Sequence, residues 1–313
     1  MKLPSIDIII PNWNGKALLE GNLPHVQAAC EPLPTPQKRI VVIDDGSTDE
    51  SVEFLRSTYP DIILIINERN IGFHRSVNKA AAASAADIVL LLNSDMEPHP
   101  ESIFHLYKHF FHKDHIFAAS GKIYSADKKT FLYGNRGGIF TKGHFILTEK
   151  PEDASSQTLF ACGGGGAFDR QLFLELGGFD TLFYPFYYEE QDLSYRALKR
   201  GFHIHYEPAS IMYHQVQATI GKKLKRTRIR LISARNNYLF IIKNITDPVW
   251  TLHFILCTPL GIVKSLLHGN LRFLIAFLMA IPRIPRAFLA RWREKKYHIK
   301  TDREIFKEVG SEK

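Results

Sequence analysis

The sequence predicts an α/β fold in which a mostly parallel sheet has helices on both faces. Within the first hundred residues, short apolar runs alternate with helix-forming segments, and each run ends at polar residues. The runs are Ile6–Ile10, Arg39–Ile43, Ile62–Ile66 and Ile88–Leu92. A short continuous apolar run is typical of a strand that is buried on both faces. Strands that alternate with helices at this spacing indicate parallel pairing, and an α/β fold follows.

The composition is that of a globular protein. The 313 residues suit one large domain, or one domain with an appendage, and 45% of them are hydrophobic against 23% charged. The three cysteines are far apart and fit neither a disulfide framework nor a zinc pattern, which predicts a reducing cytosolic setting. The N-terminus has no apolar run long enough for a signal peptide, so we expect a protein that is not secreted.

Polar side chains follow each of the four predicted strands. Parallel pairing places all four strand ends at one edge of the sheet, where open α/β sheets bind their ligands. Any single end is explained by residues that form turns or cap helices, but four acidic or amide ends at one edge favour a ligand site. The four ends are Asn12–Asn14, Asp44–Asp45, Asn67–Asn70 and Asn93–Asp95.

The chemistry of this edge favours a diphosphate that is held through a divalent cation. No glycine fingerprint of the dinucleotide-binding or P-loop type follows these strands, which argues against both classes of protein. An edge with carboxylates and few cationic side chains needs Mg²⁺ or Mn²⁺ to hold a polyphosphate. We therefore expect one of these ions as the cofactor.

Several further segments can be assigned from local patterns. Ser47 and Glu50 have the spacing of a capping box, which predicts a helix from there to about Ser57. The histidine-rich stretch from His105 to Phe117 predicts a surface helix rather than a metal cluster, because no cysteine accompanies its histidines. The segment Arg136–Gly143 is predicted to be a loop.

A second group of polar residues is predicted in the middle of the chain. Gly163–Gly166 allow the backbone to approach a ligand closely or to turn. Glu189, Glu190 and Asp192 begin a predicted helix and follow five aromatic residues. Such an apolar setting raises a carboxyl pKa toward the range of a general base. The structural alternative is that the helix dipole favours acids there and that Asp192 pairs with Arg196.

Four segments of the first half carry a resemblance to a known family. IIIPNWNG, VVIDDGSTDES, NIGFHRSVNKA and LLNSDMEP, in this order, resemble the nucleotide-binding half of family 2 glycosyltransferases with the Rossmann-like GT-A fold, of the rhamnosyltransferase-like, cell-surface polysaccharide type. The resemblance implies that Asp45 contacts the nucleotide base, that Trp13 lies against it, and that Asp95 is the one acid kept from a DxD-type metal motif. The other residues that it places at the nucleotide-sugar site are Pro11, Asn14, Asn70, Gly72, Asn93 and Ser94.

The block that runs from the glycines to KRGF resembles the acceptor side of the same family, which ends in a Glu-Asp-x-Asp motif. The resemblance places the catalytic base on Glu190, where Asp is usual. Because Glu is one methylene longer, Glu189 and Asp192 remain alternatives. The resemblance also places a metal-coordinating histidine at His214, and this second ligand would support the single carboxylate of Asp95.

The last part of the chain is apolar and basic. Gly221–Arg230 has six Lys/Arg and no acid, a pattern of a solvated helix face or of a contact with the donor diphosphate or anionic lipid. Val249–Leu267 is borderline as a membrane-spanning helix, and Leu271–Ile281 is too short. The basic segment Arg283–Lys300, with its Trp and Tyr, favours helices that lie on the cytoplasmic leaflet. A helical pair packed on the catalytic domain and a homodimer interface are the alternatives.

We therefore expect an inverting glycosyltransferase that moves a sugar from a UDP- or dTDP-linked donor to a hydroxyl of a glycan or polyprenyl-linked acceptor. Residues 1–245 would form the catalytic domain, with the nucleotide-sugar half at 1–100 and the acceptor half at 101–245. Residues 246–313 would form a helical extension, and the protein would be cytoplasmic and peripheral on the inner face of the cell membrane. A sugar-phosphate nucleotidyltransferase and a non-catalytic carbohydrate- or lipid-binding scaffold are alternatives, whereas the basic runs carry no module that reads nucleic acid.

Overall fold

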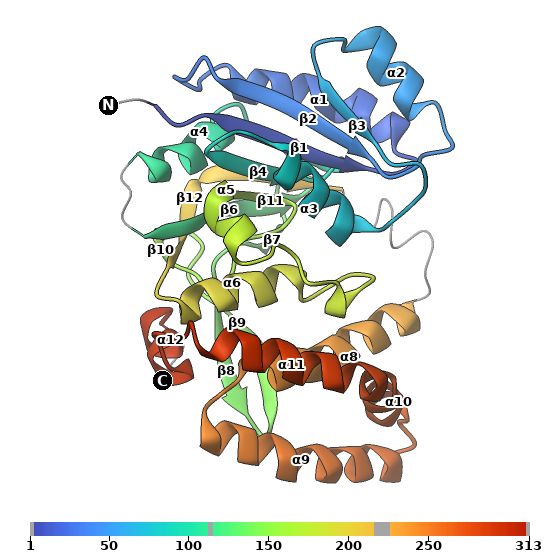
Figure 1. Ribbon diagram of the computed structural model, residues 1–313, viewed down its shortest axis with the longest axis vertical. Coiled ribbons are helices and arrows are strands. Elements are labelled where there is room, and N and C mark those ends of the chain that lie inside the picture. Colours follow the sequence, from blue (N-terminus) through green and yellow to red (C-terminus); the bar gives the residue numbers. More distant parts are fainter. Residues whose placement is uncertain (1–2, 112–114, 216–225, 311–313) are drawn as a thin grey trace.

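A computed structural model describes residues 3–111, 115–215 and 226–310, and its central feature is one large sheet (Figure 1). Its path of neighbouring strands is β10-β12-β6-β11-β4-β1-β2-β3, with β5 paired to β12 and β7 to β6. Strand β1 pairs in parallel with β2 and β4, and β2 pairs in parallel with β3. The four apolar runs are therefore strands, as predicted, with the bounds β1 (Ile6–Asn12), β2 (Lys38–Asp44), β3 (Ile63–Ile66) and β4 (Ile88–Leu92).

The sheet is buried on both faces, and alternate residues of β1 show this. Ile8 and Ile10 belong to the hydrophobic core beneath α1 (Lys16–Cys30) and α4 (Ser102–Tyr107). Ile9, between them, belongs to the core on the opposite face. That second core includes residues of α3 (Phe73–Ala83), α5 (Arg170–Glu175) and α6 (Glu189–Lys199). Successive side chains of a strand point to opposite faces, so a continuous apolar run is what a two-sided core requires.

One predicted helix start is wrong. Helix α2 (Ser51–Thr58) begins after Glu50, and no side chain caps it. Ser47 is instead part of the turn after β2, where its hydroxyl donates a 2.6 Å hydrogen bond to Asp44. The capping-box spacing is a local signal, and a buried acid next to the serine competes for the same hydroxyl.

The chain after β4 adds both parallel and antiparallel strands to the sheet. Strand β11 runs antiparallel between β4 and β6, and β12 runs parallel to β6. The prediction of a loop at Arg136–Gly143 is wrong. This segment forms β8 and the turn of a two-stranded hairpin with β9. The elements are η1 (Lys108–Phe110), β5 (Met96–Pro98), β6 (Ile116–Ser125), β7 (Phe131–Tyr133), β8 (Arg136–Thr141), β9 (His144–Glu149), β10 (Ser156–Gln157), β11 (Gly165–Asp169), η2 (Thr181–Phe183) and β12 (His203–His214).

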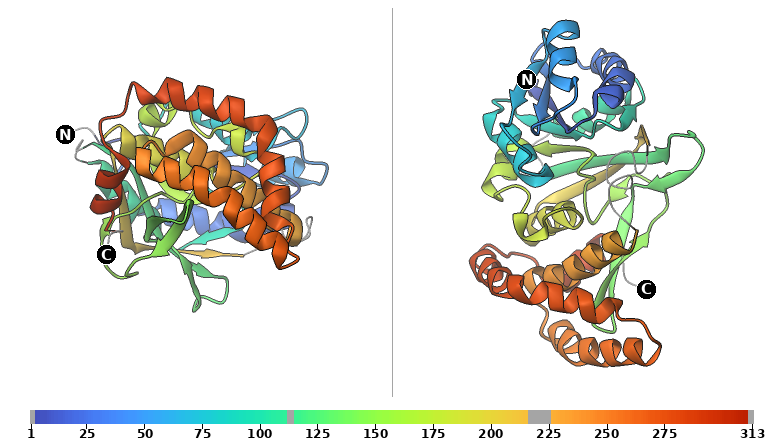
Figure 2. Two further views of the ribbon diagram at one scale, coloured as in Figure 1. Left: turned by 90° about the horizontal axis from the view of Figure 1, so that it is seen from below. Right: turned by 90° about the vertical axis from the view of Figure 1, so that its right-hand side faces the viewer.

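Helices make up the last part of the described chain and lie beyond the sheet, below α6 in Figure 1. Helix α8 packs against α10 and α11, whereas α9 lies at the far end of the molecule in Figure 1 and in the right-hand view of Figure 2. The basic run predicted at Gly221–Arg230 is described only from Arg226, where α8 starts, and its first half lies outside the described residues. The helices are α8 (Arg226–Asn244), α9 (Pro248–Leu267), α10 (Arg272–Ala280), η3 (Ile281–Arg283), α11 (Ile284–Lys295) and α12 (Asp302–Glu308).

Asp302, the first residue of α12, joins α6 to the beginning of α9. Its buried carboxylate pairs with Lys199 at 2.8 Å and accepts a 2.5 Å hydrogen bond from the Tyr195 hydroxyl. It also accepts hydrogen bonds from the backbone N–H groups of Thr246 and Asp247, at 2.7 and 2.6 Å. We call this set of contacts the Asp302 clamp. The segment after residue 245 is therefore tied to the acceptor half, although the predicted domain boundary itself stays a prediction.

The Asp302 clamp predicts a large effect on stability. Asp302→Ala should lower the free energy of unfolding by about 3–5 kcal/mol, because it leaves the buried ammonium of Lys199 without its partner. Glu308→Ala is the matched control, since its ion pair with Lys300 lies at the surface and should cost less than about 1 kcal/mol. Urea unfolding of both variants measures the difference. Equal losses would mean that the Asp302 clamp does not stabilise the protein.

Candidate active site

The polar ends of the four parallel strands meet at one edge of the sheet, and two buried acids at the end of β2, Asp44 and Asp45, hold the adjoining loops. Asp44 accepts hydrogen bonds from the Asn12 side chain at 2.9 Å and from the backbone of Ser47 at 2.8 Å. Asp45 accepts from the backbone N–H groups of Ile71 and Gly72, at 2.9 and 2.8 Å. The acid pair thus fixes the loops that follow β1 and β3.

Asn14 connects the loops after β1 and β2. Its side-chain oxygen accepts a 2.7 Å hydrogen bond from the backbone of Thr48, and its own N–H donates to the Ser47 hydroxyl at 2.8 Å. Its φ of 51° is a left-handed conformation that Asn tolerates better than most residues. Of the other predicted nucleotide-sugar residues, Pro11 and Trp13 are half-buried at this edge, and Asn70 is exposed in the loop that Asp45 holds.

Asp95 and His214 come together because β5 pairs with the end of β12, with His214 opposite Met96. The two side chains are 3.4 Å apart, measured from His214 Nε2 to Asp95 Oδ2. A 3.0 Å hydrogen bond joins His214 Nδ1 to the Tyr133 hydroxyl, which leaves Nε2 facing the carboxylate. The buried Asp95 Oδ1 has no hydrogen-bond partner among the described residues.

This pair fits a divalent cation. An unpaired buried carboxylate oxygen and an imidazole nitrogen held in place by a second hydrogen bond are the features of a metal ligand set. Within the part of the chain that the structure describes, no cluster of three or more His, Cys, Asp or Glu forms. The remaining coordination positions would therefore fall to phosphate and water oxygens, as is common for Mg²⁺.

Glu189 and Glu190 open helix α6 directly after two residues with strained backbone. Tyr187 and Tyr188 have φ values of 68° and 76°, and such conformations in residues other than glycine tend to occur at functional sites. Burial raises the pKa of Glu190 well above its ordinary value, and the charge of Glu189 raises it further. A carboxyl with a raised pKa can act as a proton acceptor near neutral pH.

Two glycines separate this acid from the end of β4. A Cβ on Gly163 would lie 3.0 Å from Glu190 Oε2, and a Cβ on Gly164 would lie 2.4 Å from Asn93 Nδ2. Any side chain here would force the two groups apart. The glycine run therefore brings the acid of α6 and the Asn93–Asp95 end of β4 close to the same stretch of backbone. The predicted close approach of this backbone to a ligand stays a prediction.

His74 is a residue of this site that the sequence interpretation missed. It is fully buried, its Nε2 lies 3.5 Å from Glu189 Oε2, and its ring packs against those of Phe179 and Tyr184. Neither ring nitrogen has a hydrogen-bond partner within the described ranges. A single histidine in a helix-forming segment gives no local signal of such a position.

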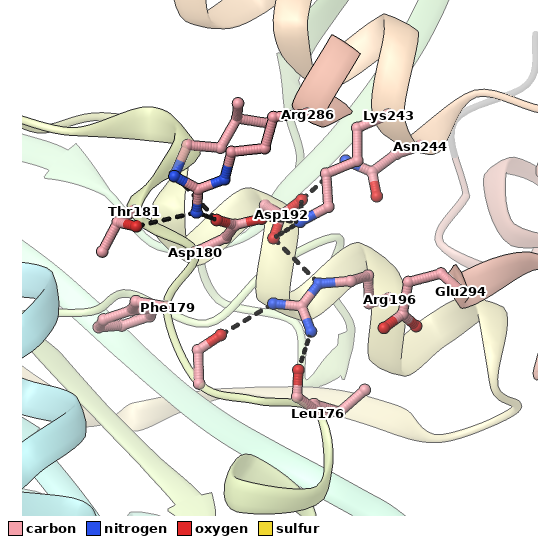
Figure 3. Close-up of polar contacts among 12 residues, drawn as sticks. Leu176, Phe179, Asp180, Thr181, Asp192, Arg196, Lys243, Asn244, Arg286 and Glu294 are labelled. Carbon is pink, nitrogen blue, oxygen red and sulfur yellow. Dashed lines mark hydrogen bonds and ion pairs between the residues drawn. The ribbon is translucent and has the colours of Figure 1, made fainter. Parts of the chain in front are cut away.

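Asp192 lies in a buried ion cluster (Figure 3). Its carboxylate accepts from Arg196 Nε at 2.9 Å, from Lys243 Nζ at 2.8 Å and from Asn244 Nδ2 at 2.9 Å. Lys243 also binds Asp180. Burial raises the pKa of Asp180, but the charge and hydrogen bond of Lys243, the Leu182 N–H and the charge of Arg286 together outweigh it and hold that pKa well below its usual range. The predicted pairing with Arg196 is confirmed. Because both oxygens of Asp192 are occupied, the geometry favours a structural role over the catalytic alternative.

Helix α8 positions the aromatic segment before Glu189. The Asn236 amide donates to the backbone carbonyls of Phe183, Phe186 and Tyr187, at 2.9, 3.0 and 2.8 Å. Its neighbour Asn237 donates a 2.6 Å hydrogen bond to the Tyr188 hydroxyl. The asparagine pair directly before the apolar run Tyr238–Ile242 was the available signal for this contact, and the sequence interpretation did not use it.

Comparisons with known proteins identify the family of the chain. The family model described as glycosyl transferase family 2 matches residues 7–177. The chain is 35% identical over 103 residues to an undecaprenyl-phosphate 4-deoxy-4-formamido-L-arabinose transferase of Pseudomonas savastanoi pv. phaseolicola, which covers 31% of this chain and 30% of that protein. The enzyme of the same name from Serratia proteamaculans is 29% identical over 110 residues, which cover 34% of this chain and 33% of that one. The match thus spans about a third of these relatives.

Three solved structures share the fold. GalNAc-T7 with UDP, GalNAc and Mn²⁺ has a TM-score of 0.68 at 16% identity, over 99% of this chain and 57% of that one. A Pyrobaculum calidifontis mannosyltransferase in complex with GDP-Man and Mn²⁺ has 0.56 at 16%, over 95% and 86%. S. aureus TarS with UDP-GlcNAc has 0.58 at 14%, over 97% and 90%. The chain therefore belongs to glycosyl transferase family 2 and has the GT-A fold.

Proposed function

We propose that this protein is an inverting enzyme that transfers a sugar from a nucleotide-diphosphate sugar to a hydroxyl of a lipid-linked acceptor. The observation that carries the proposal is the partly buried carboxyl of Glu190, which lies across two glycines from the Asn93–Asp95 end of β4. A hydroxyl must lose its proton as it attacks, whereas a phosphate oxygen is already an anion. A carboxyl with a raised pKa beside the site therefore favours a hydroxyl acceptor over the phosphate that the relatives' name specifies.

The donor would lie at the polar edge of the sheet. Asp45 and Trp13 would hold the base, beside the loop that Asp45 keeps in place. Asp95 and His214 would hold Mg²⁺ or Mn²⁺, supported by the unpaired Asp95 Oδ1 and the 3.4 Å approach of His214. Bound there, a divalent cation supplies a positive charge that stabilises the departing diphosphate.

Glu190 would accept the proton of the acceptor hydroxyl as that oxygen attacks the anomeric carbon. The new carbon–oxygen bond forms on the face opposite the bond to the diphosphate, which breaks, so the configuration inverts and the nucleoside diphosphate leaves. Glu189 would support this step through its charge, which keeps the Glu190 pKa raised. The strained backbone of Tyr187 and Tyr188 would set the direction in which α6 presents both acids.

We also propose that the protein lies on the cytoplasmic face of a membrane. The windows at Pro248–Leu267 and Arg272–Lys295 are long and apolar enough to cross a membrane, and only 6% and 17% of them are buried. Exposed apolar side chains in these windows include Leu260 at 69% and Trp292 at 75%. The Asp302 clamp holds the beginning of α9, and α10 returns to pack on α8. Helices anchored at both ends in this way favour lying in the interface rather than crossing it.

The assignment of the base predicts a loss of chemistry without a loss of binding. Glu190→Gln should lower transfer by roughly 10²–10⁴-fold, because the amide cannot accept the proton. Mn²⁺-dependent binding of UDP or dTDP, measured by titration calorimetry, should stay unchanged. Glu175→Gln, at an exposed position of α5, is the control and should retain full activity. Full transfer by Glu190→Gln would overturn the assignment and favour an acceptor that needs no base.

The two neighbouring acids predict a specific pH dependence. Glu190 must be ionised to act as a base, so kcat/KM should fall as the pH drops through its raised pKa. Glu189→Gln removes one of the causes of that raised pKa, and the acidic limb of the pH profile should move to lower pH. Profiles of wild type and variant, measured at saturating metal, test this. A limb that stays in place or moves to higher pH would show that Glu189 does not act on the base.

The metal pair predicts a loss of metal-dependent binding. Asp95→Ala should abolish the Mn²⁺-dependent part of nucleotide binding, and His214→Ala should weaken it. The reason is that the proposed metal ion is bound by these two side chains, which lie 3.4 Å apart. His203→Ala, at the other end of β12, is the matched control and should bind as wild type does. Calorimetry with Mn²⁺ and UDP, with and without EDTA, measures this. Unchanged titrations for both site variants would place the metal elsewhere.

A further inference from the structure

A groove of about 670 Å³ lies beside the candidate active site and includes none of the residues assigned there to the base or the metal. Its walls are β9, the aromatic segment at Tyr187–Tyr188, α8 and the beginning of α10. Its polar, basic and aromatic lining residues include His144, Tyr188, Arg230, Asn237, Arg272 and Phe273. It therefore lies between the helix that carries the acids and the helices with exposed apolar faces.

The groove is suited to an anion. Arg230 comes from α8 and Arg272 from the first residue of α10, and the described lining contains no Asp or Glu. No ion pair joins either guanidinium to a carboxylate within the described residues, although the Arg272 guanidinium lies 5.0 Å from the centre of the Phe273 ring. Burial lowers the pKa of His144, so this residue adds no positive charge near neutral pH. Guanidinium groups bind phosphate oxygens with directional hydrogen bonds.

The groove also has an apolar side that leads to the exposed helices. The His144 ring lies 6.1 Å from that of Phe273 and 6.3 Å from that of Tyr238. Beyond it, Leu271 on the turn into α10 is 55% exposed, and Ile275 on α10 is 38% exposed. Helix α10 contacts α9, which also exposes apolar side chains such as Leu260. A hydrocarbon chain that leaves the groove can therefore remain in contact with apolar side chains.

One wall of the groove is tied directly to the acids of α6. Asn237 donates hydrogen bonds to the Tyr188 hydroxyl and to the Phe145 carbonyl, at 2.6 and 2.9 Å. Tyr188 immediately precedes Glu189. A molecule with its charged group in the groove would therefore have its next chemical group beside the loop that presents Glu189 and Glu190.

We propose that this groove binds the diphosphate of an isoprenoid-diphosphate lipid that carries the acceptor sugar. Arg230 and Arg272 pair with the phosphate oxygens, the isoprenoid chain leaves along α10 and α9, and the sugar hydroxyl faces Glu190. The identity of the acceptor rests on the proposed function. The groove itself is defined by its geometry and charge.

The test measures binding without transfer. Farnesyl diphosphate is titrated into the full chain by calorimetry in EDTA, so that no metal can hold a diphosphate at Asp95. Farnesol and inorganic pyrophosphate are the probes for the chain alone and the charge alone. The variants are Arg230→Gln, Arg272→Gln and the double substitution. The matched controls are Arg228→Gln and Arg293→Gln, two exposed positions outside the groove.

Wild type should bind farnesyl diphosphate at least tenfold more tightly than either partial probe. Each groove variant should weaken this binding several-fold and the double variant at least tenfold, with an unchanged thermal midpoint, because each charged hydrogen bond that is lost is a strong one. The controls should stay within twofold of wild type. Asp95→Ala should also bind as wild type does, since the groove and the metal pair are separate sites.

Three results would overturn the proposal. The double variant binding as wild type does would remove the two arginines from the site. Equal losses in Arg228→Gln would show general surface attraction. Displacement of farnesyl diphosphate by phosphatidylglycerol vesicles, but not by phosphatidylcholine vesicles, would assign the groove to a membrane headgroup. None of these results bears on Mn²⁺-dependent nucleotide binding, so the proposed function would be judged separately by the Glu190 and Asp95 variants.

Discussion

The position of helix α6 depends on the ion pairs and hydrogen bonds of one buried carboxylate, that of Asp192. It binds Arg196 within α6 and Lys243 and Asn244 at the end of α8, so one acid fixes the helix that presents Glu189 and Glu190. Charges are expensive to bury, and the cluster is stable only because every member has partners. The same α8 holds the aromatic segment through Asn236. The orientation of the acids is therefore set by a helix that contains none of them.

The first and middle parts of the chain pack closely where two glycines have no side chain. Gly163 and Gly164 allow the Glu190 carboxyl and the Asn93 amide to approach the same stretch of backbone. His74, from the donor half, reaches Glu189 of the acceptor half by the same close packing. Groups from the two parts of the chain thus lie close together, so a charge change at His74 alters the electrostatics of Glu189.

The sequence predicts the parts of this structure that have local signals. Four apolar runs identify the parallel strands, and the motif resemblance pairs Asp95 with His214, which the structure places 3.4 Å apart. Their role in binding a metal stays a prediction. The partners of Asp192 on α8 and the burial of His74 had no such signal, because contacts between distant segments leave no periodicity in either one. The hairpin of β8 and β9 was missed since its glycines and short strands are also typical of a loop.

The late position of Asp302 in the chain determines when the Asp302 clamp can form during synthesis. Helices α9, α10 and α11 are all made before Asp302, so their apolar surfaces exist for a time without the residue that ties the start of α9 to α6. Residues 1–100 are synthesised much earlier and supply most of the core between the sheet and α1. Folding can therefore proceed from the sheet outward. The contact of Asp302 with the start of α9 can therefore form only after α9, α10 and α11 have been synthesised.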